Sequence, residues 1–108
     1  MRYKVMMTES AVRDLEELDD YISTHDSIES ANYVLDSLSE VINTLNEFPS
    51  RGNYPPELSA LGIQEYREVF FKPYRVIYRV LEKNVYIYLI CDGRRDMQSF
   101  LQRRLFSV

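Results

Sequence analysis

The sequence predicts an α+β domain in which two antiparallel helices pack on a mostly antiparallel sheet, and three observations predict it. Apolar residues recur at helical spacing in the first half of the chain, alternate at strand spacing in residues 74–81, and return to helical spacing near the C-terminus. The chain has 108 residues, 45% hydrophobic and 28% charged, which is typical of one globular domain. We therefore treat residues 1–108 as a single domain.

The N-terminal quarter predicts a strand and a helix. Residues 2–7 mix valine, tyrosine and methionine with basic side chains, which indicates a short strand. Thr8 is suited to the N-cap of a helix that ends near residues 23–25. Its acidic face, which includes Asp14, is expected to face solvent, and its apolar stripe consists of Ala11, Leu15, Leu18 and Ile22.

A second helix is predicted after Asp26, which forms the pattern of a capping box with Glu29. Its apolar stripe runs as far as Phe48. Pro49 is expected to end the helix, because proline disfavours helical geometry in the residue before it. Residues 49–60 contain glycine, asparagine and proline and predict a loop, with a short turn at residues 57–61. The two helices form an antiparallel hairpin.

The second half predicts a sheet and a closing helix. Residues 64–71, 74–81 and 85–90 are rich in β-branched and aromatic side chains, with a turn at residues 83–84. Asp92 and Gly93 end the last strand, and Asp96 is suited to the N-cap of a helix over residues 97–105.

Counting residue types excludes several kinds of protein. One cysteine and one histidine cannot build a zinc site from these ligands, and a single cysteine forms no internal disulfide. No apolar run approaches the roughly 20 residues of a membrane span. We expect a cytoplasmic protein without metal, cofactor or membrane. Cys91 is expected to be a packing residue, and His25 a solvated one, rather than a nucleophile and its base.

The net charge of −4 is divided unevenly along the chain. Residues 1–50 carry three basic and eleven acidic groups, a balance of −8, whereas residues 51–108 carry ten basic and six acidic groups, a balance of +4. The acidic half disfavours docking to a surface dense in phosphate. A basic binding face is therefore expected only on the sheet and the closing helix, and no sequence-specific nucleic-acid binding is expected.

Arginines are the candidate binding residues of this basic half. Arg75 and Arg79 share a strand face, and Arg94 and Arg95 follow the next strand. Guanidinium groups beside tyrosines suit phosphates or carboxylates. The alternative is internal ion pairing with Glu65, Glu68, Asp92 and Asp96, and we expect it more for Arg94 and Arg95, which lie among carboxylates, than for Arg75.

These segments resemble the RelE/ParE superfamily of small bacterial toxins. The resemblance is carried by Tyr66-Arg67-Glu68, by residues 73–80 with Arg75 and Arg79, by Asp92-Gly93-Arg94-Arg95-Asp96, and by the helical hairpin that precedes them. It covers nearly the whole chain and implies a βααβββ fold with a closing helix, a cytoplasmic toxin and a cognate antitoxin. The antitoxin would lay an extended segment and a helix along the sheet and the hairpin.

The superfamily contains two activities. RelE-like members are ribosome-dependent mRNA endonucleases, whereas ParE-like members block DNA gyrase without nuclease chemistry. The position before Gly93, often histidine in the superfamily, is Asp92 here, and a carboxyl with an ordinary pKa near 4 is a poor proton donor at neutral pH. The missing histidine and the acidic first half favour a ParE-like gyrase inhibitor over the RelE-like nuclease. A module that only titrates an antitoxin is a third hypothesis.

We accordingly expect no catalytic residue. The residues expected to contact the antitoxin or the target, DNA gyrase, are Arg75, Arg79, Arg94, Arg95, Arg103 and Arg104. Antitoxin tails of this superfamily are often acidic, and contacts between them and these arginines would be charge-assisted.

Overall fold

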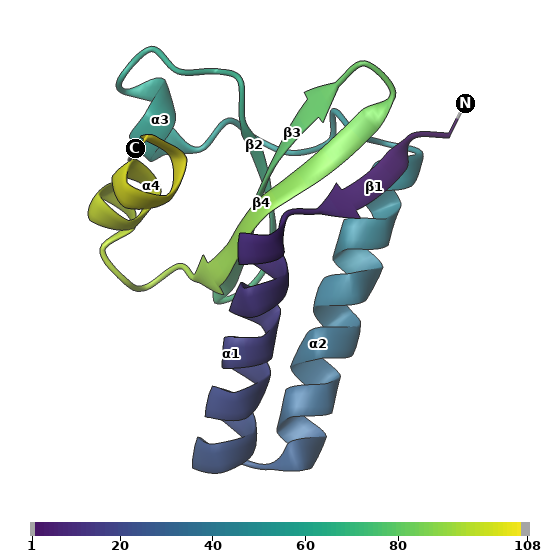
Figure 1. The fold of residues 1–108 in the computed structure, drawn as a ribbon, viewed down its shortest axis with the longest axis vertical. Helices are drawn as coiled ribbons and strands as arrows, with labels where there is room; N and C mark the ends of the chain where they lie inside the picture. The colour runs from purple at the N-terminus through teal and green to yellow at the C-terminus, as the bar shows by residue number, and fades with distance from the viewer. Residues whose placement is uncertain (1, 107–108) are drawn as a thin grey trace.

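The computed structural model describes residues 2–106 (Figure 1). Its elements are β1 (Lys4–Met7), α1 (Glu9–His25), α2 (Ile28–Asn43), η1 (Thr44–Asn46), α3 (Pro56–Ser59), β2 (Arg67–Phe71), β3 (Tyr74–Leu81), β4 (Asn84–Asp92) and α4 (Met97–Phe106). The connected end of the α1–α2 hairpin projects beyond the sheet (Figure 1). This order confirms the predicted α+β class and the βααβββ arrangement with a closing helix.

The helical hairpin begins as predicted, but its connection differs. The Thr8 hydroxyl accepts a hydrogen bond of 3.1 Å from the Ala11 amide and caps α1. Ser27, not Asp26, caps α2: its backbone is extended and its hydroxyl accepts from the Ser30 amide at 2.9 Å. The Asp26 amide instead donates to the Ile22 carbonyl and closes α1, so the expected capping box is wrong by one residue.

The end of the second helix also differs from the prediction. α2 stops at Asn43, and the chain tightens into the 3₁₀ turn η1 before Pro49 is reached. Leu45 in this turn is fully buried, whereas Phe48 is 61% exposed and does not continue the apolar stripe. The loop that follows contains α3, which overlaps the short turn expected at residues 57–61 but begins one residue earlier and ends at Ser59.

The sheet has the strand order β1-β4-β3-β2, in which β1 is parallel to β4 and the other pairs are antiparallel. It is therefore mostly antiparallel, as predicted. Residues 64–66 lie outside β2, whose pairing with β3 begins at Arg67. The β3–β4 turn consists of Glu82, in the left-handed region with φ 57°, and Lys83, one residue earlier than expected.

Opposite faces of the sheet support two separate cores. The core under α1 and α2 includes Ala11, Leu38, Val76, Tyr78 and Ile87. The core on the other face joins the sheet to α3 and α4, and it includes Leu58, Ile77, Leu89, Phe100 and Leu101. A bulge in the β3–β4 register leaves Tyr88 opposite no β3 residue, because Ile77 pairs with Leu89 and Tyr78 with Ile87.

A buried tyrosine fixes the long loop to the sheet. The Tyr78 hydroxyl donates to the Pro49 carbonyl at 2.7 Å and accepts from the Gly52 amide at 3.1 Å. A Cβ at Gly52 would lie 2.6 Å from both the Tyr78 hydroxyl and the Glu68 carbonyl, so this position requires glycine. The loop that carries α3 is thereby held over the sheet.

Candidate functional site

Arg75 lies in a carboxylate clamp formed with Glu57 of α3 and Glu68 of β2. Its Nη1 and Nη2 donate to the two Glu57 oxygens at 2.8 Å each, and its Nε donates to Glu68 Oε1 at 2.7 Å. Arg75 is 8% exposed and Glu68 is 2% exposed. Gly93 makes room for this geometry, because a Cβ there would lie 2.7 Å from Arg75 Cδ. We call Arg75, Glu57 and Glu68 the Arg75 clamp.

The Arg75 clamp fixes the charge of its members. The hydrogen bonds from Arg75 lower the pKa of Glu57, whereas burial raises the pKa of Glu68. The two carboxylates, Glu57 first, raise the pKa of Arg75. An anion arriving from outside would have to displace Glu57 to reach the guanidinium in a bidentate geometry.

The internal pairing expected for Arg94 is present with Asp92, but the order expected for Arg75 and Arg95 is reversed. Arg75 is held by two carboxylates, whereas the described residues offer Arg95 no carboxylate within salt-bridge distance. Glu57 was not a predicted partner, since the sequence predicts a loop at residues 49–60 and no spacing links Glu57 to β3.

Arg79 lies on the same face of β3 but outside the Arg75 clamp. Its guanidinium is 5.9 Å from the ring centre of Tyr66, which makes an edge contact with Tyr88 at 5.5 Å. Nearby, Arg67 stacks on Tyr54 at 4.5 Å and donates to the Gly52 carbonyl at 2.8 Å. A shallow hollow of about 330 Å³ lies between the Arg67 and Arg79 side chains. The predicted arginine–tyrosine surface is thus present here, around Arg79.

Arg94 pairs with Asp92 in the turn after β4. The Arg94 Nε lies 3.0 Å from Asp92 Oδ1, and Nη2 lies 2.6 Å from Oδ2. This hydrogen bonding lowers the pKa of Asp92. Asp92 is therefore ionised at neutral pH and cannot serve as the proton donor that RNA cleavage would require.

Arg104 is a structural residue that ties α4 to α1. Its guanidinium binds both oxygens of Asp14, at 2.8 and 3.0 Å, and the Tyr88 carbonyl at 3.0 Å. Asp14 Oδ2 also accepts from the Ile90 amide at 3.0 Å. The expectation that Asp14 faces solvent is wrong, because α4 covers it.

The remaining predicted arginines gather around one aromatic ring of α4. The guanidinium carbons of Arg95, Arg104 and Arg103 lie 3.8, 5.3 and 5.7 Å from the centre of the Phe100 ring. The structure therefore divides the six predicted residues among four places: the Arg75 clamp, the Arg79 surface, the Asp92–Arg94 pair and the Phe100 cluster. They do not form one continuous patch.

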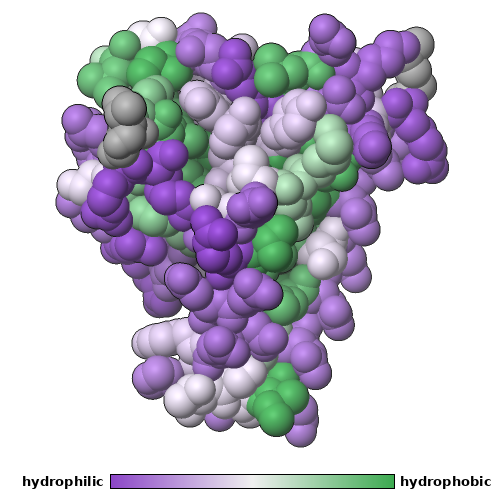
Figure 2. Space-filling model, in the orientation of Figure 1, coloured by the Kyte–Doolittle hydropathy of each residue, from purple (hydrophilic) through white to green (hydrophobic). Residues whose placement is uncertain are grey.

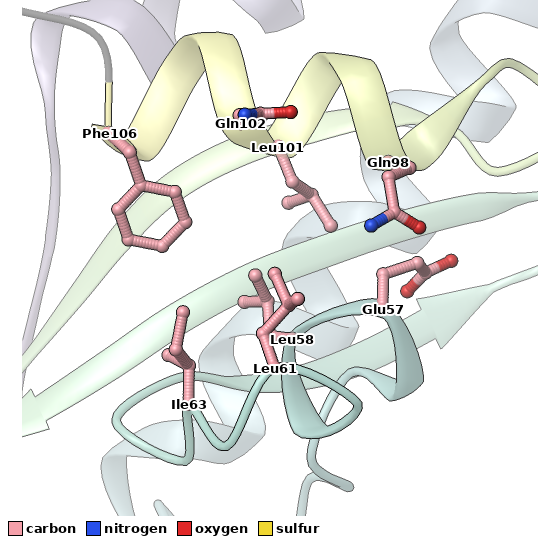
Figure 3. Close-up of a pocket in the computed structure, with 8 residues that line it drawn as sticks. All are labelled: Glu57, Leu58, Leu61, Ile63, Gln98, Leu101, Gln102 and Phe106. Carbon is pink, nitrogen blue, oxygen red and sulfur yellow. The ribbon is translucent and has the colours of Figure 1, made fainter.

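An apolar groove between α3 and α4 was not predicted. Leu101 and Phe106 point from α4 towards Leu58, Leu61 and Ile63, with Glu57 and Gln98 at one end (Figure 3). Leu61 is 61% exposed and Phe106 is 43% exposed. Figure 2 shows hydrophobic residues gathered over the α3 and α4 region. The groove has a volume of about 320 Å³.

Cys91 and His25 form no catalytic pair. Cys91 is buried, its Sγ lies 3.5 Å from the Met97 sulfur, and burial raises its pKa to about 12. His25 stacks on Tyr21 at the exposed end of α1, with ring centres 4.1 Å apart. Within residues 2–106, no three His, Cys, Asp or Glu side chains gather in a metal-binding group, and no helix is long and apolar enough to span a bilayer.

A helical hairpin on one face of a four-stranded mixed sheet, with a short C-terminal helix on the other, defines the fold class of the RelE and ParE toxins. The family model for the ParE toxin of the type II toxin–antitoxin system parDE matches residues 5–97. The chain therefore belongs to the ParE toxin family. No curated protein matches the sequence.

Solved structures share the fold at low sequence identity. A chain of the chromosomal ParDE toxin–antitoxin system from P. aeruginosa is 19% identical, with a TM-score of 0.70 over 84% of this chain and 96% of that one. A chain of the toxin–antitoxin complex RelBE2 from Mycobacterium tuberculosis is 21% identical, with a TM-score of 0.63 over 85% of this chain and 99% of that one. A mutant of the E. coli toxin RelE in its free state is 13% identical, with a TM-score of 0.59 over 93% of each chain.

Proposed function

We propose that this protein is the toxin of a type II toxin–antitoxin pair, that it inhibits DNA gyrase by binding to it, and that a cognate antitoxin neutralises it in the cytoplasm. The observation that carries the proposal is the Arg75 clamp. Membership of the ParE family supports the class of target, and the clamp supports a mechanism without phosphodiester chemistry.

Cleavage of RNA through its 2′-hydroxyl needs a base, an acid and free cations for the phosphate. In this chain the strand arginine Arg75 is enclosed by two carboxylates, and Asp92 is paired with Arg94 and ionised. Neither position offers what a nuclease requires. These contacts support binding over RelE-like mRNA cleavage.

The charge distribution supports the same choice. The helical hairpin carries most of the acidic groups and a single arginine, Arg13, whereas the other arginines and all lysines lie outside the hairpin. A ribosomal surface dense in phosphate would repel the hairpin. A protein target or an acidic antitoxin tail can bind to the sheet and α4 without contacting the acidic hairpin. On that side Arg79 is half-buried and Arg103 is exposed.

The surfaces offered to partners differ in chemistry. The Arg79 surface and the exposed Arg103 supply charge-assisted contacts for a carboxylate-rich segment. The groove between α3 and α4 supplies the exposed apolar side chains of Leu61 and Phe106 for an anchor residue of the partner (Figure 3). We propose that the antitoxin contacts the Arg79 surface and that the target contacts α4.

The proposal is tested by adding purified toxin to a gyrase supercoiling reaction and, in parallel, to translating ribosomes whose mRNA is mapped for cuts. We expect supercoiling to fail while mRNA stays intact, and added antitoxin to restore supercoiling. Codon-positioned cuts with normal supercoiling would instead establish the RelE-like nuclease. No effect in either reaction would leave a module that only binds an antitoxin, and would refute gyrase inhibition.

A further inference from the structure

A hollow between the start of α1 and α4 brings together three arginine side chains. It has a volume of about 260 Å³. It is lined by Ser10, Arg13, Asp14, Glu17, Arg95, Phe100 and Arg104. We call it the α1–α4 hollow.

The guanidinium groups of the α1–α4 hollow have donors to spare. Arg13 makes one hydrogen bond, of 3.3 Å, to Ser10 Oγ. Among residues 2–106 the Arg95 guanidinium has no hydrogen-bond acceptor, and its central carbon lies 3.8 Å from the centre of the Phe100 ring. Of the acidic residues that line the hollow, Asp14 is already occupied by Arg104, and Glu17 is exposed. The hollow therefore carries an excess of positive charge.

Two of its cations are held in place before any ligand arrives. Arg104 is fixed by both Asp14 oxygens and by the Tyr88 carbonyl, and its side chain is only 20% exposed. The flat face of Phe100, itself 6% exposed, supports Arg95. Binding an anion here therefore has to order chiefly the Arg13 side chain, which limits the entropic cost of binding.

We propose that the α1–α4 hollow binds the phosphate group of a small phosphorylated ligand. Arg13 of α1 and Arg95, which precedes α4, both line the hollow with unused guanidinium donors, whereas both Nη atoms of Arg104 are already bound to Asp14, so Arg104 contributes positive charge. A tetrahedral phosphate presents at least three oxygens to these two guanidinium groups, whereas a carboxylate presents two. The acidic face of α1 beside the hollow repels a long polyphosphate chain, which restricts the ligand to a small molecule.

An adjoining cleft has room for the rest of such a ligand. It has a volume of about 650 Å³, shares Asp14, Glu17 and Arg95 with the hollow, and is walled by Tyr21 and Tyr74. Its size lies in the range of small-molecule sites, and its aromatic walls suit a nucleobase. Free phosphate would fill the hollow alone, and a nucleotide would fill both spaces.

Isothermal titration of the full chain with ADP and with inorganic phosphate, at constant ionic strength set with chloride, tests this site independently of toxicity. At least one ligand is expected to bind, and Arg95→Gln and Arg13→Gln are each expected to weaken binding about tenfold, through loss of charge-assisted hydrogen bonds. The matched control is Arg2→Gln, which removes an exposed arginine paired with Glu47 and is expected to bind as wild type.

The two sources of phosphate are separated by the same titrations. Tighter binding of ADP than of phosphate, weakened by Tyr21→Ala, identifies a nucleotide, and equal binding identifies free phosphate. The site is refuted if neither ligand binds or if Arg95→Gln and Arg13→Gln both bind like wild type. Tighter binding of duplex DNA than of ADP would also overturn the restriction to small ligands.

Discussion

The Arg75 guanidinium binds the Glu57 carboxylate through two parallel hydrogen bonds of 2.8 Å, although the two residues lie in different elements. Both lie on the face of the sheet that packs against α3 and α4. Glu57 comes from α3, in the loop after the hairpin, and Arg75 from β3. This contact neutralises the strand arginine and fixes α3, and with it one wall of the groove in Figure 3.

Glu57→Gln is expected to destabilise the protein. The substitution leaves Arg75 buried with one carboxylate partner instead of two, and hydrogen bonds to charged groups contribute about 1.5–3 kcal/mol each. We expect the free energy of unfolding in urea to fall by about 1–3 kcal/mol. Glu65→Gln is the matched control, because Glu65 is exposed and makes no ion pair in the described chain. Equal stability of the two variants would show that the contact contributes nothing.

The contribution of Glu57 depends on pH in a defined direction. Its pKa in the folded protein lies below the ordinary value of 4.5, so its stabilising effect is fully present above about pH 4.5 and is lost as the pH falls through the folded pKa. Burial raises the pKa of Glu68, so the ionisation of Glu68 lowers the free energy of unfolding as the pH rises from about 4.5 through its folded pKa. The stability gap between wild type and Glu57→Gln should be constant from pH 6 to 8 and shrink below about pH 4. A gap that widens in acid would contradict this assignment.

Asp14→Asn is expected to loosen α4. The substitution removes one charged oxygen from the bidentate Arg104 pair, while the side chain keeps its size. We expect a loss of about 1–3 kcal/mol and faster amide hydrogen exchange in α4, with α2 unchanged. Asp20→Asn, on the exposed side of α1, serves as the control. An unchanged rate of amide hydrogen exchange in α4 would show that the apolar core between the sheet, α3 and α4 is sufficient to hold this helix.

Gly93→Ala tests the packing around the Arg75 clamp. The added Cβ would lie 2.7 Å from Arg75 Cδ and 3.0 Å from the Pro73 carbonyl, and Arg75 is fixed at its far end by two carboxylates. A loss of about 1–3 kcal/mol in urea unfolding is expected from this crowding. Gly62, with φ +76° and open space around it, is the comparison. Gly62→Asn should cost far less, because asparagine tolerates the left-handed region.

The helical hairpin and the closing helix are predictable from sequence because their signals are local. Thr8 caps α1 through a residue three positions away, and the alternation in β3 distributes Val76 and Ile77 to opposite cores. Asp26 misleads because two adjacent polar residues can each begin a helix, and backbone geometry selects Ser27.

The ion pairs of the candidate site are not predictable in this way. Asp14 and Arg104 are separated by 90 residues, and Glu57 and Arg75 are separated by 18. These pairs form only because α3 and α4 pack on the sheet face opposite the hairpin. An exposed acidic helix face and a buried ion pair have the same sequence pattern. Arginine positions could therefore be predicted, but not their partners.

The central claim is that the toxin acts by binding gyrase and not by turnover, and stoichiometry tests it most directly. Toxin is titrated into a supercoiling reaction at several fixed gyrase concentrations. We predict that the toxin concentration that halves supercoiling rises in proportion to gyrase once gyrase exceeds the dissociation constant, and that excess gyrase restores activity. Progressive, irreversible loss of activity at toxin far below the gyrase concentration would contradict this, as would undisturbed supercoiling at every ratio.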